Sequence, residues 1–340
     1  MAASADILPA SRAARVILAE APADAVEPLA DARDLALLAL GRSLKARDYR
    51  FTTITPASHQ RVNARAAKPR AQLADIFGWN RPFQRGDLPA DLLEHLSAAG
   101  ALETTNQQLR SAVRFSTLGK QLFAHSSFPT EQGDAVFFGP DTYRFARMIR
   151  QSLAEKALKP GARIIDIGSG SGAGGLHAAA LADPSATLVL TDINHSALRF
   201  SRINAALNGA RNVHIVESDL FAAVEGQFEL IVSNPPYLVD PLARLYRHGG
   251  GALGSDLSVN IAEQGIVHLA PGGRLLLYTG SAIVAGKDAF YETLAARLSG
   301  RPLRWSYDEI DPDVFGEELA YPPYDEADRI AVVAVTINVA

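Results

Sequence analysis

Residues 163–175, RIIDIGSGSGAGG, join an apolar run to a glycine-rich turn and then to the start of a helix-like segment. A short apolar run of this kind is typical of a buried strand, and glycines let the backbone turn tightly and approach a ligand closely. Gly170, Gly172 and Gly175 also satisfy the G-x-G-x-x-G spacing of dinucleotide-binding folds. The stretch therefore predicts a strand–turn–helix unit of an α/β fold with a nucleoside ligand at the turn.

The sequence downstream of this unit repeats the same alternation. Strand-like runs alternate with helical segments of about 10–15 residues up to residue 280, and residues 303–311 and 329–339 add two more strand-like runs. The run at 329–339, RIAVVAVTINV, is long and rich in β-branched residues and predicts a buried closing strand. We expect a doubly wound, mostly parallel, seven-stranded α/β sheet of Rossmann-like type, with helices on both faces.

Residues 1–130 have a different character and predict a smaller, mostly α-helical domain, separate from a second domain over 131–340. Helical spacing marks 10–47, 71–80 and 88–103, and short alternating segments follow at 108–117 and 119–128. Two helices followed by a two-stranded hairpin are the element order of a winged helix. Residues 1–130 hold 16 Lys and Arg against 12 Asp and Glu, with the excess between 47 and 85. That segment is either a solvated surface or a contact for RNA or DNA.

The composition excludes several classes of chemistry. The chain has no cysteine, which removes disulfides, thiolate catalysis and cysteine-bound zinc. Its histidines lack metal-ligand spacing, so no metal site is expected. The first 25 residues carry acidic side chains where a secretory signal needs an apolar core, and no run of about 18 apolar residues occurs. We expect a cytoplasmic protein without a membrane span.

Three carboxylates follow predicted strands and suit a nucleoside cofactor. Asp192 ends the strand LVLTD (188–192) and can accept hydrogen bonds from both ribose hydroxyls. Asp219, in ESDLF (217–221), either reads an adenine amino group or caps a helix. Asp166 is poorly suited to a pyrophosphate but compatible with a cationic ligand end. At this point both a nicotinamide dinucleotide and S-adenosylmethionine stay open.

The segment FELIVSNPPYLVD (228–240) places Asn234, Pro235, Pro236 and Tyr237 after a predicted strand, at the sheet edge where α/β folds bind ligands. The Pro-Pro step removes two N–H donors and makes the loop rigid. The Asn234 side-chain carbonyl and a nearby backbone carbonyl can then accept hydrogen bonds from one planar NH₂ group, and Tyr237 can stack on it. We predict Asn234, Pro235 and Tyr237 as catalytic residues; a plain strand-ending turn is the alternative.

DIGSGSG, TDI, SDLF and NPPY, in this order and spacing, resemble class I S-adenosylmethionine-dependent methyltransferases. More narrowly they are similar to the HemK/PrmC-like small-domain branch, which includes release-factor glutamine methyltransferases and RNA base-amine methyltransferases. The resemblance covers roughly residues 135–340 and implies S-adenosyl-L-methionine as cofactor. It also implies that FFGPDTYRFARMI (137–149) closes over the cofactor. The implied cofactor-binding residues are Asp166, Gly168, Gly170 and Gly172 at the methionine end, Asp192 and Ile193 at the ribose, Asp219 and Leu220 at the adenine, Asn234 beside the acceptor, and Phe138, Pro140 and Thr142 in the entry segment.

Two features depart from the glutamine branch. Residues 278–280 read YTG, where glutamine methyltransferases usually carry an acidic residue, and the N-terminal region resembles a basic winged helix instead of a small helical bundle. The leading hypothesis is an N-methyltransferase acting on a planar NH₂ group, either a glutamine amide of a protein or an exocyclic amine of an RNA or DNA base. The alternatives are an NAD-dependent oxidoreductase, or a non-catalytic winged-helix nucleic-acid-binding regulator with a cofactor-sensing domain. The sequence gives no oligomeric state.

Overall fold

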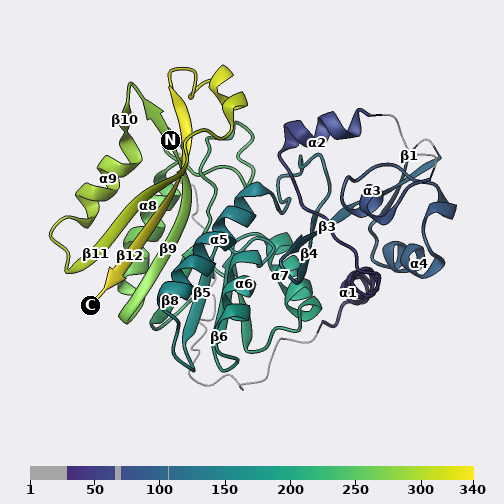
Figure 1. Ribbon diagram of the computed structural model, residues 1–340, viewed down its shortest axis with the longest axis horizontal. Helices are drawn as coiled ribbons and strands as arrows, with labels where there is room; N and C mark the ends of the chain where they lie inside the picture. Colours follow the sequence, from purple (N-terminus) through teal and green to yellow (C-terminus); the bar gives the residue numbers. More distant parts are fainter. Residues whose placement is uncertain (1–28, 66–69, 106) are drawn as a thin grey trace, which may run out of the picture.

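The computed structural model describes residues 29–65, 70–105 and 107–340, and Figure 1 traces the chain through a large sheet region and a smaller N-terminal region. Residues 10–28 of the predicted helix 10–47, and the basic residue Lys68, lie outside the described residues. The remainder of that helix is α1 (Ala32–Ala46), which begins at the side-chain cap Asp31.

The large sheet runs in the order β11-β12-β9-β8-β5-β6-β7, with a short strand, β10, paired to β9. Neighbours from β9 through β7 pair in parallel, whereas β12 runs antiparallel to both β9 and β11. The predicted mostly parallel, seven-stranded, doubly wound sheet is thus confirmed, with β10 as an addition. The strands are β5 (Arg163–Ile167), β6 (Thr187–Asp192), β7 (Val213–Glu217), β8 (Phe228–Ser233), β9 (Leu269–Val284), β10 (Lys287–Asp288), β11 (Leu303–Asp311) and β12 (Arg329–Val339).

Successive side chains along each strand point to opposite faces of the sheet, and each face has its own hydrophobic core. On β5, Ile164 joins the core that contains α5 and α6, while Ile165 joins the core that contains α8 and α9. The predicted buried strand at 329–339 is confirmed as β12, which lies between β9 and β11 and is buried along most of its length. The covering helices are α5 (Pro140–Glu155), α6 (Ala173–Leu181), α7 (His195–Leu207), α8 (Asp256–Val267) and α9 (Ala289–Leu298), with the short η2 (Gly316–Ala320) before β12.

The sheet order also fixes where a ligand can bind. β5 leads through α6 to β6 on one side, and its other neighbour is β8, so the order of connections reverses between β5 and β8. Open α/β sheets bind ligands at such a switch point, beyond the carboxyl ends of the strands. The glycine turn after β5 and the Asn234 loop after β8 lie on the two sides of this switch point.

The N-terminal region differs from the expected winged helix, because two hairpins follow α4 instead of one. The predicted strand 108–117 is divided between β2 and β3, which belong to different two-stranded sheets. The chain bends at Ala112, whose N–H donates to the Ala101 carbonyl at 2.8 Å, while the Ser111 hydroxyl donates to the Val113 carbonyl at 2.6 Å. The elements are α2 (Pro56–Asn63), α3 (Leu73–Phe77), η1 (Arg85–Asp87), α4 (Ala90–Ala98), β1 (Leu102–Thr105), β2 (Gln108–Ser111), β3 (Val113–Leu118) and β4 (Gln121–Ser126).

Helix α7 joins the N-terminal region to the sheet region. Its Phe200, Ile203 and Leu207 share one hydrophobic core with α1, α4 and β3. Two asparagines one turn apart, Asn204 in α7 and Asn208 at its C-cap, pair with the backbone of β4. Asn204 accepts from the Ala124 N–H at 2.8 Å and donates to its carbonyl at 2.9 Å, and Asn208 does the same at Leu122 at 3.0 and 2.9 Å. The division at residues 130 and 131 stays a prediction.

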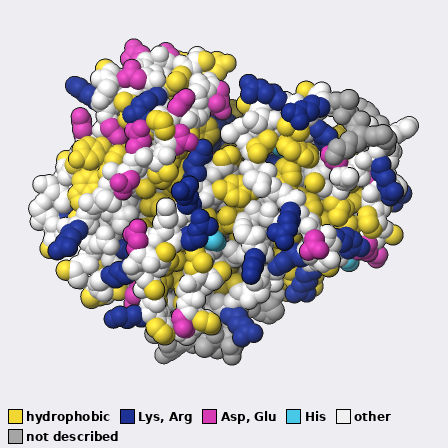
Figure 2. Space-filling view, viewed as in Figure 1, with side chains coloured by type: hydrophobic (Ala, Val, Ile, Leu, Met, Phe, Trp, Pro, Cys, Tyr) yellow, Lys and Arg dark blue, Asp and Glu magenta, His cyan; other side chains and the backbone are white. Residues whose placement is uncertain are grey.

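The basic segment 47–85 is partly neutralised by acidic neighbours. Arg47 pairs with Asp91 at 2.9 Å and Arg81 with Asp75 at 3.3 Å. Figure 2 shows Lys and Arg side chains running down the middle of the viewed face, and acidic side chains gathered at its upper left. Among the described residues, no helix is long and apolar enough to cross a membrane.

Candidate active site

A cavity of about 440 Å³ lies at the carboxyl ends of β5, β6 and β8. It brings together residues from four separate sequence motifs, and residues of the N-terminal region, among them Thr53, Gln60 and Arg114, form part of its wall. Of the predicted site residues, these line it: Thr142, Asp166, Gly168, Gly170, Asp192, Ile193, Asp219, Leu220, Asn234, Pro235 and Tyr237.

The turn after β5 needs its glycines for backbone shape and for open space. Gly168 and Gly170 have φ of 68° and 55°, a region that other residues rarely adopt. A Cβ added at either position would meet no protein atom within 4 Å, so the cavity begins directly at this backbone. Gly172, with φ of 76°, is the N-cap of α6 and does not line the cavity, because a Cβ there would meet the Ser201 side chain at 3.1 Å. Its position supports the turn, not the cavity wall that the resemblance implies.

Asp166 and Asp192 are each held by backbone N–H groups of the chain that follows their strands or neighbours them. Asp166 accepts from the Gly175 N–H at 2.7 Å, and its side chain is almost completely buried, which raises its pKa to about 7. Asp192 accepts from the N–H groups of Gly170 and Asn194, both at 2.9 Å, and burial raises its pKa as well. The two carboxylates therefore sit at fixed positions on the wall of the cavity.

The residues after β7 form a turn instead of a helix. Leu220 has a positive φ of 50°, and Asp219 is exposed at the cavity with its carbonyl accepting from the Ala222 N–H at 3.0 Å. The alternative in which Asp219 caps a helix is thus wrong, because no helix begins there.

The loop after β8 presents one free amide to the cavity. Ser233 ends the strand and donates to the Ile167 carbonyl at 2.7 Å, which ties this loop to the glycine turn. The Asn234 side chain is half-buried, lines the cavity and has no hydrogen-bond partner within the described part of the chain. An amide without a protein partner at this place is available to a ligand.

Tyr237 differs from the expected stacking platform. Its ring is only 8% exposed and packs edge-on to Phe315 at 5.9 Å. It also packs closely against Gly280, where an added Cβ would come within 2.3 Å of the ring. Burial, followed by the nearby Asp141 charge, raises the pKa of the Tyr237 hydroxyl far above its usual range. The ring supports the loop from beneath and leaves little surface for an acceptor.

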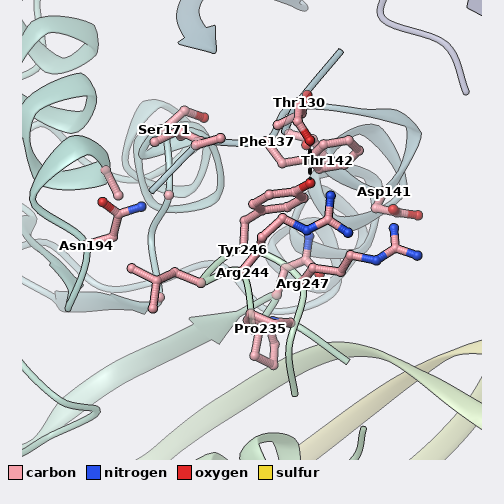
Figure 3. Close-up of a pocket in the computed structure, with 18 of the residues that line it drawn as sticks. Thr130, Phe137, Asp141, Thr142, Ser171, Asn194, Pro235, Arg244, Tyr246 and Arg247 are labelled. Atoms are coloured by element: carbon pink, nitrogen blue, oxygen red, sulfur yellow. Dashed lines mark hydrogen bonds between the residues drawn. The ribbon is translucent and has the colours of Figure 1, made fainter. Parts of the chain in front are cut away.

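In the entry segment, the cavity is lined by Phe137 and not by its predicted neighbour Phe138. Phe138, expected to touch the cofactor, is 1% exposed and packs against Phe123 and His125 in the core. Phe137 lines the cavity in its place and stacks on Tyr246 at 6.1 Å. Figure 3 shows Phe137 and Tyr246 together at the cavity, with the Tyr246 hydroxyl bonded to the Thr130 carbonyl.

Sequence reasoning missed a buried carboxyl in the same cavity. Asp141 is 7% exposed, accepts from the Tyr278 hydroxyl at 3.0 Å, and lies 3.4 Å from Arg144. Burial raises the pKa of Asp141, whereas the Tyr278 hydrogen bond and Arg144 oppose that rise. Its sequence signal is weak, because an acidic residue in the first turn of a helix is common for reasons of stability alone. Tyr278, noted above as a departure, is therefore the direct partner of Asp141.

A loop after Tyr237 covers one side of the cavity. Arg244 pairs with Asp240 at 2.6 Å, and Arg247 bonds to Glu318. Gly249 lies so close to the Pro236 and Gly254 carbonyls that a Cβ would come within 2.6 Å of both, which explains the glycine-rich sequence there. Figure 3 shows Arg244, Tyr246 and Arg247 side by side at the cavity, above Pro235, with the Arg247 guanidinium near Asp141. In the described ranges, no three His, Asp or Glu side chains are grouped as a metal site.

Comparison with known proteins identifies relatives of this region. Residues 146–294 match the family model for the methyltransferase small domain. A release factor glutamine methyltransferase from Deinococcus radiodurans is 37% identical over 202 residues, 56% of this chain and 66% of that protein. Another, from Cereibacter sphaeroides, is 33% identical over 208 residues, 57% of this chain and 69% of that protein. The matched stretch thus spans about two thirds of each relative.

Among solved structures, the ribosomal protein L11 methylase of Lactobacillus delbrueckii subsp. bulgaricus has a TM-score of 0.39 and 18% identity, over 57% of this chain and 78% of that one. The likeness is too distant to support an argument about the site. The two curated relatives are methyltransferases, so they give no support to the NAD-dependent or non-catalytic alternatives.

Proposed function

The chain belongs to the class I S-adenosylmethionine-dependent methyltransferases, in the branch of the release factor glutamine methyltransferases, and from this premise we propose that it methylates a glutamine side-chain amide of a protein. The observation that carries the proposal is the unpartnered Asn234 side chain, which lines the same cavity as Gly168 and Asp192. A single cavity then holds both the methyl donor and the nitrogen that receives the methyl group.

The residues present fit S-adenosyl-L-methionine as the cofactor. The open space at Gly168 and Gly170 admits a ligand against the backbone, and Asp192 offers carboxylate oxygens to ribose hydroxyls. Asp166, on the wall of the cavity, would pair with the cationic amino acid end, and Asp219 and Leu220, which also line the cavity, would border the adenine. When bound, this cofactor supplies a methyl group on a positively charged sulfur, which is already a reactive leaving group.

The acceptor side requires positioning more than acid–base chemistry. An amide nitrogen is a weak nucleophile because its lone pair is delocalised. The Asn234 carbonyl oxygen and a backbone carbonyl of the loop would accept hydrogen bonds from the NH₂ group and fix its orientation. Pro235 and the buried Tyr237 ring keep this loop rigid. Such positioning favours the transition state over the free amide.

The test measures methyl transfer and cofactor binding separately. Wild-type protein is incubated with S-adenosylmethionine and a release factor, and mass spectrometry looks for a gain of about 14 Da on a glutamine, the mass of one methyl group less one hydrogen. Asn234→Ala should lower kcat by about a hundredfold, as expected for a lost positioning group, and leave cofactor affinity from calorimetry within about twofold. Gln151→Ala, which removes an exposed side-chain amide on α5 outside the cavity, is the matched control.

Three outcomes would contradict the proposal. Transfer by Asn234→Ala at the wild-type rate would remove the role of Asn234. Tight NADH binding without S-adenosylmethionine binding would restore the oxidoreductase. A methyl group found on RNA or DNA bases, with no modified glutamine, would move the acceptor to nucleic acid.

A further inference from the structure

Arg114 is a buried cation on the wall that the N-terminal region contributes to the cavity. It lies on β3, its side chain lines the cavity, and the residue is 3% exposed. Thr53, Gln60 and Phe128 line the same wall. This wall comes from the N-terminal region, whereas the turn that would hold the cofactor follows β5 of the sheet region.

The charge of Arg114 has no carboxylate partner in the described part of the chain. Its Nε donates to the Gly78 carbonyl at 2.8 Å, and its Nη2 makes a long contact of 3.5 Å to the Thr53 hydroxyl. The Phe51 ring lies 5.7 Å from the guanidinium. A guanidinium carries five N–H donors, so these contacts leave the Nη1 donors unused within the described residues. A buried cation held only by neutral groups is costly unless a ligand completes it.

The surroundings favour a ligand with one negative charge. The two nearest histidines are neutral at physiological pH: burial, and then Arg114 itself, lower the pKa of His59 to about 4 and that of His125 well below its usual range. Ser116 and Thr53 hydroxyls bond to each other and, through Ser116, to His125, so they add no charge. One guanidinium matches one carboxylate in charge and in its planar fork of donors, whereas a phosphate dianion would remain under-compensated.

We propose that Arg114 is the binding site for a carboxylate of the acceptor molecule, in the same cavity as the Asn234 amide. The acceptor is then a molecule with two recognised groups, a planar NH₂ at Asn234 and a carboxylate at Arg114. The identification of the NH₂ end rests on the proposed function, whereas carboxylate binding at Arg114 does not. The carboxylate comes either from a free or C-terminal amino acid or from an acidic side chain beside the glutamine in a peptide.

The experiment compares matched probes that differ only in the carboxylate. Calorimetry measures N-acetyl-glutamine against its neutral carboxamide, with and without S-adenosylhomocysteine. A second pair consists of two blocked peptide amides in which glutamine is followed by aspartate or by asparagine. The wild-type protein should bind the carboxylate member of one pair about tenfold more tightly, the effect of one charge-assisted hydrogen-bond pair. Preference within the first pair identifies a terminal carboxylate; preference within the second identifies an acidic side chain.

Variants locate the preference. Arg114→Gln should reduce it to less than twofold, while Arg114→Lys, which keeps the charge, should retain part of it. Arg244→Gln is the matched control, since Arg244 lines the same cavity but is already paired with Asp240, and it should keep the preference. Equal affinity for both members of both pairs in the wild type, including no binding at all, would overturn the proposal, as would a preference that survives in Arg114→Gln. If the wild-type protein transferred no methyl group to a glutamine but still preferred the carboxylate probes, only the proposed function would be refuted.

Discussion

Replacing Asp166 by Asn should remove the pH dependence of cofactor binding. Asp166 is buried against the start of α6, and burial places its pKa at about 7 instead of 3.8. A cationic group bound beside it favours the ionised carboxylate, so protonation of Asp166 competes with binding. Affinity for S-adenosylmethionine should therefore rise as the pH increases through 7.

The size of the effect follows from the fraction of ionised Asp166. With a pKa of about 7, the carboxyl is about 9% ionised at pH 6 and about 76% at pH 7.5, so affinity should rise about eightfold over this range. Below pH ~7.7 the amino group of the cofactor stays mostly protonated, so it contributes little to the change. Asn can still accept the hydrogen bond from the Gly175 N–H, which keeps the turn in place.

Calorimetry at pH 6.0, 6.5, 7.0 and 7.5 at constant ionic strength would measure this dependence. Asp166→Asn should bind more weakly at pH 7.5 and with nearly constant affinity across the series. Asp192→Asn is the comparison: the lost ribose contact should weaken binding at every pH, and because the Asp192 charge helps to raise the Asp166 pKa, the rise in affinity should move to lower pH without disappearing. A flat profile for the wild-type protein, or an unchanged slope in Asp166→Asn, would refute the assignment of Asp166 to a cationic ligand end.

Three further predictions concern stability and the cavity wall. The folded state keeps a proton on Asp166 that the unfolded chain releases above pH 3.8. The free energy of unfolding should therefore fall, by up to about 4 kcal/mol, as the pH rises from about 4 through about 7. In urea unfolding, the difference in stability between the wild type and Asp166→Asn should follow that fall. Gly168→Ala and Gly161→Ala both place alanine at a positive φ with free space for the Cβ, so each should lower the free energy of unfolding in urea by about 1–2 kcal/mol. Only Gly168→Ala should weaken S-adenosylmethionine binding in calorimetry. Equal cofactor affinity of the two variants would disprove the cavity role of Gly168. Tyr278→Phe removes the hydroxyl that donates to the buried Asp141, and it should lower the free energy of unfolding by about 1–3 kcal/mol in thermal denaturation. Tyr307→Phe, whose hydroxyl donates to the more accessible Asp288, is the control and should cost less than ~1 kcal/mol. An equal cost for both would show that Asp141 does not need the Tyr278 hydrogen bond.

The sheet region could be predicted from the sequence because each of its signals is local. The glycine turn follows an apolar strand directly, and Asp192 and Asn234 each stand at a strand end, so parallel pairing alone brings them to one edge. β12 could also be predicted from its sequence, since a long run rich in β-branched residues favours a buried strand. In these cases neighbouring residues determine both the element and the place of the side chain.

The other parts of the site depend on contacts between distant residues. Phe137 and Phe138 are adjacent and chemically identical, and only the direction of the chain before α5 decides which one enters the cavity. Asp141 and Tyr278 are 137 residues apart, and their hydrogen bond exists only because α5 packs against β9. The single hairpin expected after α4 was wrong for a similar reason, because the bend at Ala112 is stabilised by its bond to Ala101, which strand alternation does not reveal.

The Arg114 wall reaches the cavity through α7. Asn204 and Asn208 fill both donor and acceptor positions along the edge of β4, and β4 pairs with β3, which carries Arg114. The same helix begins three residues after the strand-end carboxylate Asp192 and is capped by Asn194, whose N–H donates to that carboxylate. Helix α7 thus connects Asp192, the proposed ribose ligand, to β4 and through it to the Arg114 wall. Because hydrogen bonds fix both of its ends, this helix sets the spacing between the proposed cofactor position and that wall, which explains why residues before 130 line a cavity at the edge of a sheet they do not join.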